Sequence, residues 1–593
     1  MKMAFQKPGF KILIAALLVL LIASILVMAA VPPVSRDALT HHLAVPKLYL
    51  KSGGMHEIPE VVFSYYPMNL DLLYMIPLYF GNDIIPKYIH FAFALLTAWL
   101  IYGYLKSRTT KTHYGLLGAL LFLSLPVILK LSITVYIDLG LVFFSTAALV
   151  YVLKWAANGS RPRYLLIAGL FCGLGLGTKY NGLISFFLLT SFIPILYLRI
   201  NLQPDEPGDG PVDAPRRQKN AAVMASLRAL KAAALFVLVA LLVFSPWMIR
   251  NSRWTGNPIY PLYQKAFNTF DLGHAEPERD TGFTAEGDME TADGGLSHFA
   301  LRKKVFNETF LELITTPARI FFQGRDDNPK YFDGRLNPYL FLFPFLAFIG
   351  FKRLSKRRKR ENLVLLNFSV LFLLYTFFKI DMRIRYIAPI IPPLVMLSVM
   401  GLYQTEIWIR DKWTGVERRI GFGLMAVVVM GLLVLNAQYL LKQFHYVDPI
   451  SYLSGRIGRD DYIEKYRKEY PAIQFVNRKL PPKTRVLAIY LGNRIYYSDR
   501  EIVCDDAFIK KAIAEASSAD ALAGILKSRG FSHLFIRSDF FKYFIFNSLS
   551  SEKRAMINHF FKTRTKRLFS EDVYHVIEIT HLRPTSMATN NTT

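Results

Sequence analysis

Residues 12–31, ILIAALLVLLIASILVMAAV, form an apolar run interrupted only by Ser24, and residues 32–50, PPVSRDALTHHLAVPKLYL, follow it directly. A helix needs about 20 mostly apolar residues to cross a bilayer, so the first run predicts a membrane span. The run is longer than the apolar region of a signal peptide, and no convincing small-residue cleavage site follows it. We therefore expect an uncleaved first span that leads into a polar outer loop.

The remainder of the chain continues this pattern. Of its 593 residues, 52% are hydrophobic and 19% are charged, whereas a soluble domain carries about a quarter charged residues. The 46 Phe and 32 Tyr exclude a mostly disordered chain, because disordered chains are poor in aromatic residues. The predicted fold class is mainly α, a polytopic membrane protein of about 11 transmembrane helices. The predicted spans are 12–31, 86–105, 114–131, 133–153, 164–178, 181–199, 232–249, 336–351, 363–380, 386–404 and 420–440.

The net charge of +27 has two interpretations, nucleic-acid binding or membrane topology. Residues 352–360, KRLSKRRKR, are mostly basic, and loops 106–113 and 154–163 carry basic residues without Asp or Glu. With eleven spans and a cytoplasmic N-terminus, all of these loops fall on the cytoplasmic side. We therefore expect a multi-pass protein of the inner (cytoplasmic) membrane, surrounded by membrane lipids, with no nucleic-acid partner.

The same topology places three polar segments outside the membrane. Loops 32–85 and 250–335 belong to a predicted transmembrane domain, residues 1–440, and residues 441–593 form a predicted extracytoplasmic domain. In that second domain, short apolar runs alternate with stretches of helical pattern, which predicts a small α/β fold. The predicted strands are 485–491, 533–537 and 573–579, and the predicted helices are 459–479, 506–528 and 549–562.

The first outer loop offers the clearest candidate for chemistry. Apolar residues at Leu39, Leu43 and Leu50 predict a helix along the membrane surface, which Asp37 would begin. Asp37 is either the N-cap of this helix or a general base at the lipid–water boundary. His41 follows Asp37 at i+4, so both side chains share one helical face and could share a proton or a metal. From the residues alone, the N-cap is the favoured reading.

Charged residues near the outer ends of other spans are further candidates. Asp138 lies in the fourth span, where an ionisable group is costly and by default functional, although it could simply bond to a neighbouring helix. Four basic residues lie at predicted outer helix ends, where the positive-inside rule disfavours them, so their presence there requires an explanation. These side chains could bind anionic lipid headgroups in general, or they could bind the phosphate of one specific lipid. These residues are Lys179, Arg250, Arg383 and Arg385.

Soluble-enzyme motifs are missing from the sequence. It has no Walker loop, no dinucleotide-binding glycine motif after a strand and no His-Glu-x-x-His, so ATP-driven transport and zincin proteolysis have no support. The pair Asp326 and Asp327 could bind a cation, but such a pair is more often part of a turn. The run Gly173-Leu174-Gly175-Leu176-Gly177 predicts close packing between helices.

Several stretches, in this order, resemble the GT-C membrane glycosyltransferases. Among these, the chain is most similar to the bacterial group related to protein O-mannosyltransferases (glycosyltransferase family 39) and to the aminoarabinose transferases of lipid A. The matching stretches are Asp37-Ala38-Leu39-Thr40-His41-His42-Leu43, Ser64-Tyr65-Tyr66-Pro67, Gly177-Thr178-Lys179-Tyr180, Pro246-Trp247-Met248-Ile249-Arg250-Asn251 with Gly256-Asn257-Pro258, and Arg383-Ile384-Arg385-Tyr386 with Pro389 and Pro392.

The resemblance implies transfer of a sugar from a polyprenyl-phosphate donor to a lipid, glycan or protein acceptor at the outer face. Asp37 matches the catalytic base and Asp138 the second acid, and His41 is placed with them as a catalytic candidate. Candidate substrate contacts are His42, Tyr65, Tyr66, Tyr180, Asn251, Tyr386, Arg325 and Asp326. Arg36-Asp37 replaces the Asp-Glu pair of protein mannosyltransferases, so no two-carboxylate metal site is expected. Tyr66-Pro67-Met68 replaces the Lys-Pro-Pro of aminoarabinose transferases, so their donor is not carried over.

The chemistry suits these residues. A phosphate leaving group needs cations near its oxygens, which Lys179, Arg250, Arg383 and Arg385 could supply. The acceptor hydroxyl needs a base, so in this constellation Asp37 is preferred as base over a pure N-cap. Attack from the opposite face would invert the anomeric centre. No metal ligand is assigned, and a divalent cation, Mg²⁺ or Mn²⁺, stays open as a cofactor.

The alternative function is a transporter or flippase of lipid-linked glycans, which would also use apolar spans and a phosphate site. Such a protein predicts paired repeats and broken helices at the membrane midplane, and the sequence has no such repeat.

Overall fold

The computed structural model describes residues 8–201, 214–264, 267, 298–380 and 382–580. The chain divides into two compact units. Of the described residues, those within 1–31, 65–271 and 294–456 form a helical unit, and those within 32–64 and 457–593 form a second unit. The first loop therefore groups with the C-terminal residues. Residues 265–266 and 268–297 of the predicted outer loop 250–335 lie outside the described residues.

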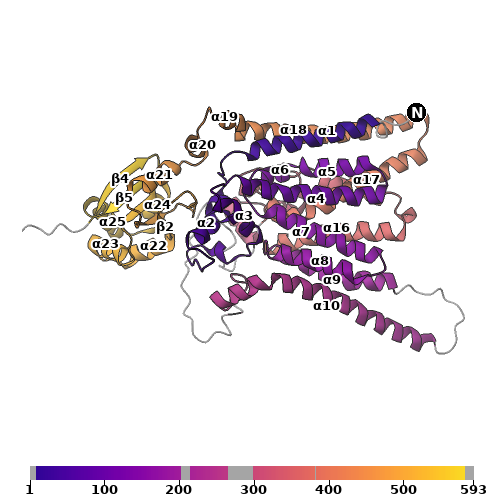
Figure 1. Cartoon of the computed structure of the whole chain (residues 1–593), viewed down its shortest axis with the longest axis horizontal. Coiled ribbons are helices and arrows are strands. Elements are labelled where there is room, and N and C mark those ends of the chain that lie inside the picture. The colour runs from indigo at the N-terminus through magenta and orange to yellow at the C-terminus, as the bar shows by residue number, and fades with distance from the viewer. Residues whose placement is uncertain (1–7, 202–213, 265–266, 268–297, 381, 581–593) are drawn as a thin grey trace, which may run out of the picture. The chain divides into compact units, whose positions relative to one another are not determined.

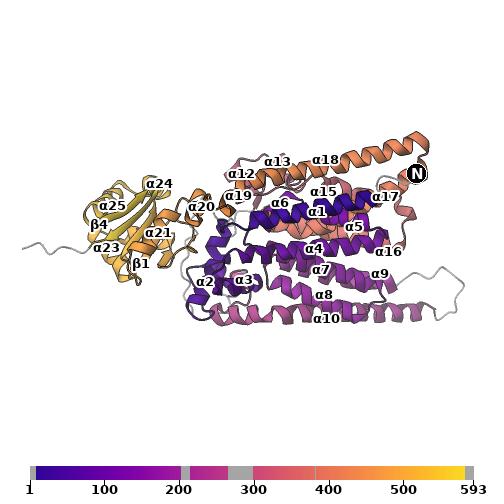
Figure 2. The same cartoon turned by 45° about the horizontal axis from the view of Figure 1, so that its top comes forward.

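Among the described residues, eight helices are long and apolar enough to cross a membrane, which makes this a multi-pass integral membrane protein. Long helices of the unit run side by side in both views (Figures 1 and 2). The eight are α1 (Pro8–Ala29), α4 (Ile85–Thr109), α7 (Asp138–Ala157), α9 (Gly182–Asn201), α10 (Ala214–Thr255), α16 (Lys356–Lys379), α17 (Ile391–Lys412, continuous with η8, Ile384–Ile390) and α18 (Gly415–Val447).

The mainly α class is confirmed, and all eleven predicted spans coincide with helical elements, but three of them are not single long helices. The pair α5 (Thr112–Leu123) and α6 (Pro126–Ser132) bends by 69°, where Pro126 starts a new helix, and raises the count to nine if taken as one span. Two others are short: α8 (Pro162–Leu176), and α15 (Tyr339–Leu342) with η6 (Phe343–Phe348).

Basic loops gather at one end of the helical unit, as the sequence pattern predicts for a shared side of the membrane. The Arg108 Nε lies 2.5 Å from an oxygen of the buried Glu361, which Arg357 also contacts at 3.0 Å. Arg360 donates to the Ala156 carbonyl at the last turn of α7. Loops 106–113, 154–163 and 352–360 thus meet at this end, which we call the basic end.

The expected close packing of glycines is confirmed between α8 and α10. A Cβ on Gly173 would lie 2.5 Å from the Ala240 carbonyl oxygen of α10, and one on Gly169 would lie 3.0 Å from the Phe236 carbonyl. Any larger side chain would force the two helices apart, so glycine permits this contact.

The second unit contains a five-stranded sheet with the order β2-β1-β3-β5-β4. The strands β1, β2 and β3 pair in parallel, whereas β5 pairs antiparallel with β3 and β4. The bounds are β1 (Arg485–Ile489), β2 (Glu501–Cys504), β3 (His533–Arg537), β4 (Thr565–Glu571) and β5 (Tyr574–Ile579).

Helices cover both faces of this sheet (Figure 1). Ile473 and Val476 of α21 pack on Val486 and Val576, whereas the opposite face packs against α22, α23, α24 and α25. These elements are α20 (Arg459–Tyr466), α21 (Tyr470–Lys479), α22 (Asp506–Glu515), α23 (Ala519–Ser528), α24 (Ser538–Ser548) and α25 (Ser551–Thr563). The predicted α/β character is confirmed; β2, β4 and α24 were not predicted.

Short elements complete the fold. In the first loop these are η2 (Ala38–His42), α2 (Ala44–Lys51) and η3 (Val62–Tyr65), and α3 (Asn69–Tyr79) follows. The remainder are α12 (His298–Phe306), α13 (Phe310–Ile314), α14 (Thr316–Arg319), η5 (Pro329–Tyr331), η7 (Phe351–Arg353) and α19 (Pro449–Leu453).

Candidate functional site

The first loop begins with one turn of π-helix, η2, closed by a hydrogen bond of 2.9 Å from the Leu43 N–H to the Ala38 carbonyl. Asp37 lies at the N-cap position, but its side chain makes no capping hydrogen bond. The capping role favoured by the residues alone is therefore not what this carboxylate does. π-Helical turns are rare and frequently occur at functional sites.

Asp37, His41 and His42 form a cluster, which we call the first-loop triad. Each offers one ligand atom, and these atoms lie within 4.8 Å of one another. The His41 ring stacks on Phe63 with centroids 4.3 Å apart, and His42 is only 5% exposed. One carboxylate and two imidazoles suit Zn²⁺ or another transition metal better than Mg²⁺, which prefers oxygen ligands.

In the helical unit, Asp138 begins α7 and pairs with Lys179. The Lys179 Nζ lies 2.9 Å from Asp138 Oδ1, and the Asp138 side chain is only 2% exposed. The other carboxylate oxygen, Oδ2, is buried and has no hydrogen-bond partner among the described residues. A carboxylate held by an ammonium is a poor proton acceptor, so the pairing favours a positioning role for Asp138 over an acid–base role.

A buried histidine braces the start of α7. The His90 Nδ1 lies 3.0 Å from the carbonyls of Leu131 and Thr134, and its Nε2 accepts from the Leu139 N–H at 3.0 Å. This geometry requires a proton on Nδ1 and none on Nε2. His90 therefore connects the end of α6 to the first turn of α7 and fixes the backbone at Asp138.

Three of the predicted phosphate-binding cations converge on one tyrosine ring. Lys179 Nζ, Arg383 Cζ and Arg385 Cζ lie 4.8, 5.7 and 5.1 Å from the ring centroid of Tyr386, and Arg385 also lies 5.3 Å from the ring of Tyr136. All three cations are half-buried, which strengthens their field. We call this group the cationic cluster.

The fourth predicted cation, Arg250, has a different environment. Its guanidinium lies between the indoles of Trp247 and Trp254, 4.6 and 4.8 Å from their centroids. Its Nη2 donates to the carbonyls of Tyr65 at 2.5 Å and Tyr66 at 3.1 Å. These contacts hold the segment at residues 65–66 in place; a phosphate contact from Arg250 stays a prediction.

Predicted substrate contacts form a buried network beside Arg250. The Asn251 Nδ2 donates to the Tyr65 carbonyl at 2.9 Å and to the Tyr180 hydroxyl at 3.0 Å, and that hydroxyl donates to the Tyr260 carbonyl at 2.9 Å. Asn251 is fully buried, so it supports the surrounding backbone. Tyr66 is half-buried, with its ring 5.4 Å from that of Tyr180.

The structure gives Arg325 and Asp326 local partners. Arg325 lies over the ring of Tyr331 at 4.4 Å, and Asp326 accepts from the Tyr439 hydroxyl at 3.0 Å. The Lys130 Nζ lies 3.6 Å from Asp326 and 3.0 Å from Asp327. A lysine thus supplies the positive charge near this acidic pair, so a cation site at Asp326–Asp327 is not supported.

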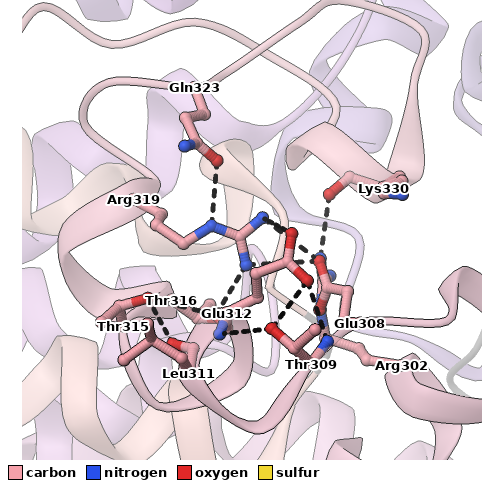
Figure 3. A network of polar contacts seen from close by, with 10 residues as sticks. All are labelled: Arg302, Glu308, Thr309, Leu311, Glu312, Thr315, Thr316, Arg319, Gln323 and Lys330. Atoms are coloured by element: carbon pink, nitrogen blue, oxygen red, sulfur yellow. Dashed lines mark hydrogen bonds and ion pairs between the residues drawn. The ribbon is translucent and has the colours of Figure 1, made fainter.

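A buried ion network stabilises the segment between α12 and α14 (Figure 3). The carboxylate of Glu308 accepts from Arg302 Nε and Nη2 at 2.7 and 2.8 Å, and Arg319 contacts it at 3.4 Å. Thr309 and Glu312 form a capping box at the start of α13. The Thr309-x-x-Glu312 spacing is a sequence signal that could have marked this helix start, whereas no motif marks the pairing of Glu308 with Arg302 and Arg319.

Residues 60–206 match the sequence profile of the family described as dolichyl-phosphate-mannose-protein mannosyltransferase. No curated protein matches the chain by sequence. The chain is similar to the structure of ArnT from Cupriavidus metallidurans in the apo state, with 12% identity and a TM-score of 0.53, over 96% of this chain and 97% of that chain. The predicted resemblance is confirmed: the chain has the GT-C fold.

Two further structures are similar at lower scores. ArnT from Cupriavidus metallidurans bound to undecaprenyl phosphate gives 13% identity and a TM-score of 0.48, over 95% of this chain and 97% of that chain. The Archaeoglobus fulgidus oligosaccharyltransferase in the apo form gives 12% identity and a TM-score of 0.48, over 89% of this chain and 70% of that chain.

Three residues that the sequence did not reveal lie beside the candidate site residues. Phe63 stacks on His41, Tyr136 lies under Arg385, and His90 braces the start of α7. A histidine in an apolar span is an unusual residue that could have marked His90, because ionisable groups there are costly. Phe63 and Tyr136 have no comparable signal, because aromatic residues are abundant throughout the chain.

Proposed function

We propose that this chain is a membrane glycosyltransferase that moves a sugar from a polyprenyl-phosphate donor to an acceptor hydroxyl at the outer face of the cytoplasmic membrane, with inversion. The cationic cluster carries this proposal. It lies at the first turn of α7, while Ala156 in the last turn of the same 20-residue helix contacts the basic end. At 1.5 Å per residue, α7 separates them by about 30 Å, the thickness of a bilayer core.

In the proposed reaction, the cationic cluster binds the donor phosphate and stabilises the charge that develops on it as the sugar leaves. Asp138 keeps Lys179 oriented through their ion pair. Asp37 takes the proton of the acceptor hydroxyl. The hydroxyl oxygen of the acceptor attacks the anomeric carbon from the face opposite the phosphate. The bond from carbon to the phosphate oxygen breaks, and polyprenyl phosphate is the second product.

The test uses the full-length protein in detergent with a panel of labelled polyprenyl-phosphate sugars. We expect release of polyprenyl phosphate from one donor class. Arg385→Met should raise KM for this donor and also lower kcat, because the cluster binds the phosphate in the ground state and stabilises its developing charge in the transition state. The matched control is Arg163→Met, whose guanidinium lies 4.8 Å from the ring centroid of Tyr164 in α8 and is not among the predicted site residues. Absence of release from every donor, with lipid-linked glycan moving across liposomes, would instead support the transporter.

The first-loop triad also fits a divalent transition metal by its donor set. Asp37, His41 and His42 would hold the ion, which would supply positive charge at the triad. Calorimetric titration with Zn²⁺ and Mn²⁺ tests this point independently of activity. Binding that is lost in His42→Ala supports the site, and equal binding by the variant contradicts it.

A further inference from the structure

The first loop and the C-terminal α/β fold belong to one compact unit, and hydrogen bonds connect them close to the triad. The Tyr496 N–H donates to the Leu39 carbonyl at 3.1 Å. Leu39 lies within η2, between Asp37 and His41. A backbone group of the C-terminal fold thus contacts the same helical turn that carries the triad.

Lys47 makes the largest set of these contacts. Its Nζ lies 2.9 Å from the carbonyl oxygens of Tyr496 and Ser498 and 3.1 Å from Asp499 Oδ1. Lys47 belongs to α2, which follows η2 after one residue. An ammonium has three donors, and here all three are used on one loop of the α/β fold.

Two more contacts hold the start of the first loop. The Tyr497 hydroxyl donates to the Pro33 carbonyl at 2.8 Å, and Arg467 donates to the Val34 carbonyl. The first-loop triad is therefore bracketed by contacts on both sides along the chain.

The loop that supplies these contacts is itself fixed. It follows β1, and the Asn477 side chain of α21 donates to the Tyr497 carbonyl and accepts from the Asp499 N–H, both at 2.8 Å. Arg494, midway along this loop, pairs with the buried Glu469 at 2.7 Å. Residues 490–499 thus form a rigid support anchored to the core of the α/β fold.

We propose that residues 490–499 position the Asp37 segment for catalysis, with Lys47 as the main positioning residue of the first loop. This inference rests on the proposed function for the role of Asp37. It gives the C-terminal α/β fold a direct part in the reaction rate, because a catalytic group displaced by about 1 Å can cost 100-fold in rate.

The test compares Lys47→Met with Lys553→Met in the full-length protein. Lys553 also bridges two backbone carbonyls of this unit, those of Ala514 and Ala516, but makes no contact to the first loop among the described residues. We expect kcat to fall about 10- to 100-fold in Lys47→Met, with donor KM almost unchanged, and Lys47→Arg to restore part of the loss. Lys553→Met should keep the wild-type rate.

Hydrogen exchange supplies a readout that does not require activity. Amides of residues 38–50 should exchange faster in Lys47→Met than in wild type, and remain unchanged in Lys553→Met. A milder pair guards against misfolding: Tyr497→Phe removes the hydroxyl bond to Pro33, and Tyr470→Phe removes one to Asp460 within the α/β fold. Only Tyr497→Phe should lower kcat.

Equal kcat in Lys47→Met and wild type would overturn the positioning role while leaving the glycosyltransferase intact. A wild type without any transfer would overturn the proposed function itself, and unchanged exchange at residues 38–50 in Lys47→Met would then also overturn the support of the loop. A parallel loss of kcat in Lys553→Met or Tyr470→Phe would show a general folding effect and contradict the assignment.

Discussion

At the scale of single residues, the ion pair of Asp138 and Lys179 shows that a buried charge is tolerated when an opposite charge lies beside it. Each was identified in the sequence as a charge near the outer end of a span, one as an acid and the other as a phosphate ligand. In the structure their charged atoms lie 2.9 Å apart. The pair explains how a carboxylate that is only 2% exposed is tolerated there.

Lys179→Met should therefore destabilise the protein, because it leaves the Asp138 carboxylate buried without its partner. Breaking one side of a buried pair costs about 3–5 kcal/mol. Thermal unfolding in detergent measures the loss, and adding Asp138→Asn should recover part of it. The control is Lys106→Met, an exposed lysine over the ring of Tyr102. An equal loss of stability in both single variants would contradict the buried-pair explanation.

At the scale of elements, the segment from α12 to α14 depends on the carboxylate of Glu308, whose side chain has 0% exposure. Glu308→Gln leaves Arg302 and Arg319 without this counter-charge, so we expect a cost of about 3–5 kcal/mol and faster proteolysis within residues 298–323. The matched control is Glu501→Gln. Glu501 pairs with Arg485 at 2.7 Å, but its side chain is 61% exposed. Exposed pairs contribute at most about 1 kcal/mol. Similar proteolysis in both variants would argue against the network.

The strand β3 gives the α/β fold a pH dependence. Burial lowers the pKa of His533, partly offset by Glu578. The unfolded histidine binds a proton near pH 6.5 and the folded one at lower pH, so stability is lost as the pH falls below about 6.5. Wild type should therefore lose more thermal stability than His533→Gln between pH 7.5 and pH 5.5. Parallel curves would show that His533 does not contribute.

Local patterns explain which elements the sequence predicts. Apolar runs of span length and alternating strand and helix patterns depend on neighbouring residues, and both were found. The π-turn at residues 38–42, the pairing of Asp138 with Lys179 and the contact of Lys47 with Tyr496 depend on residues far apart in the chain or on a rare backbone form. No periodicity encodes these contacts, so the sequence could supply the candidate residues but not their partners.

At the scale of the whole molecule, the charges of the helical unit support the sidedness used in the proposal. Three of the predicted cytoplasmic loops meet at the basic end, while the cationic cluster lies at the other end of α7. The positive-inside rule disfavours cations at an outer end, and the proposed binding of a donor phosphate would account for the cluster. In the proposal, a lipid-linked phosphate binds to this cluster, and the apolar spans provide a binding surface for its tail.

The most direct test of the account is a single-turnover measurement with Asp37→Asn and the donor identified for the wild type. The account predicts that the variant binds this donor as tightly as wild type but transfers its sugar about 100-fold or more slowly, because the acceptor loses its base. Equal transfer rates at equal donor binding would contradict the assignment of Asp37 as the base and with it the central claim.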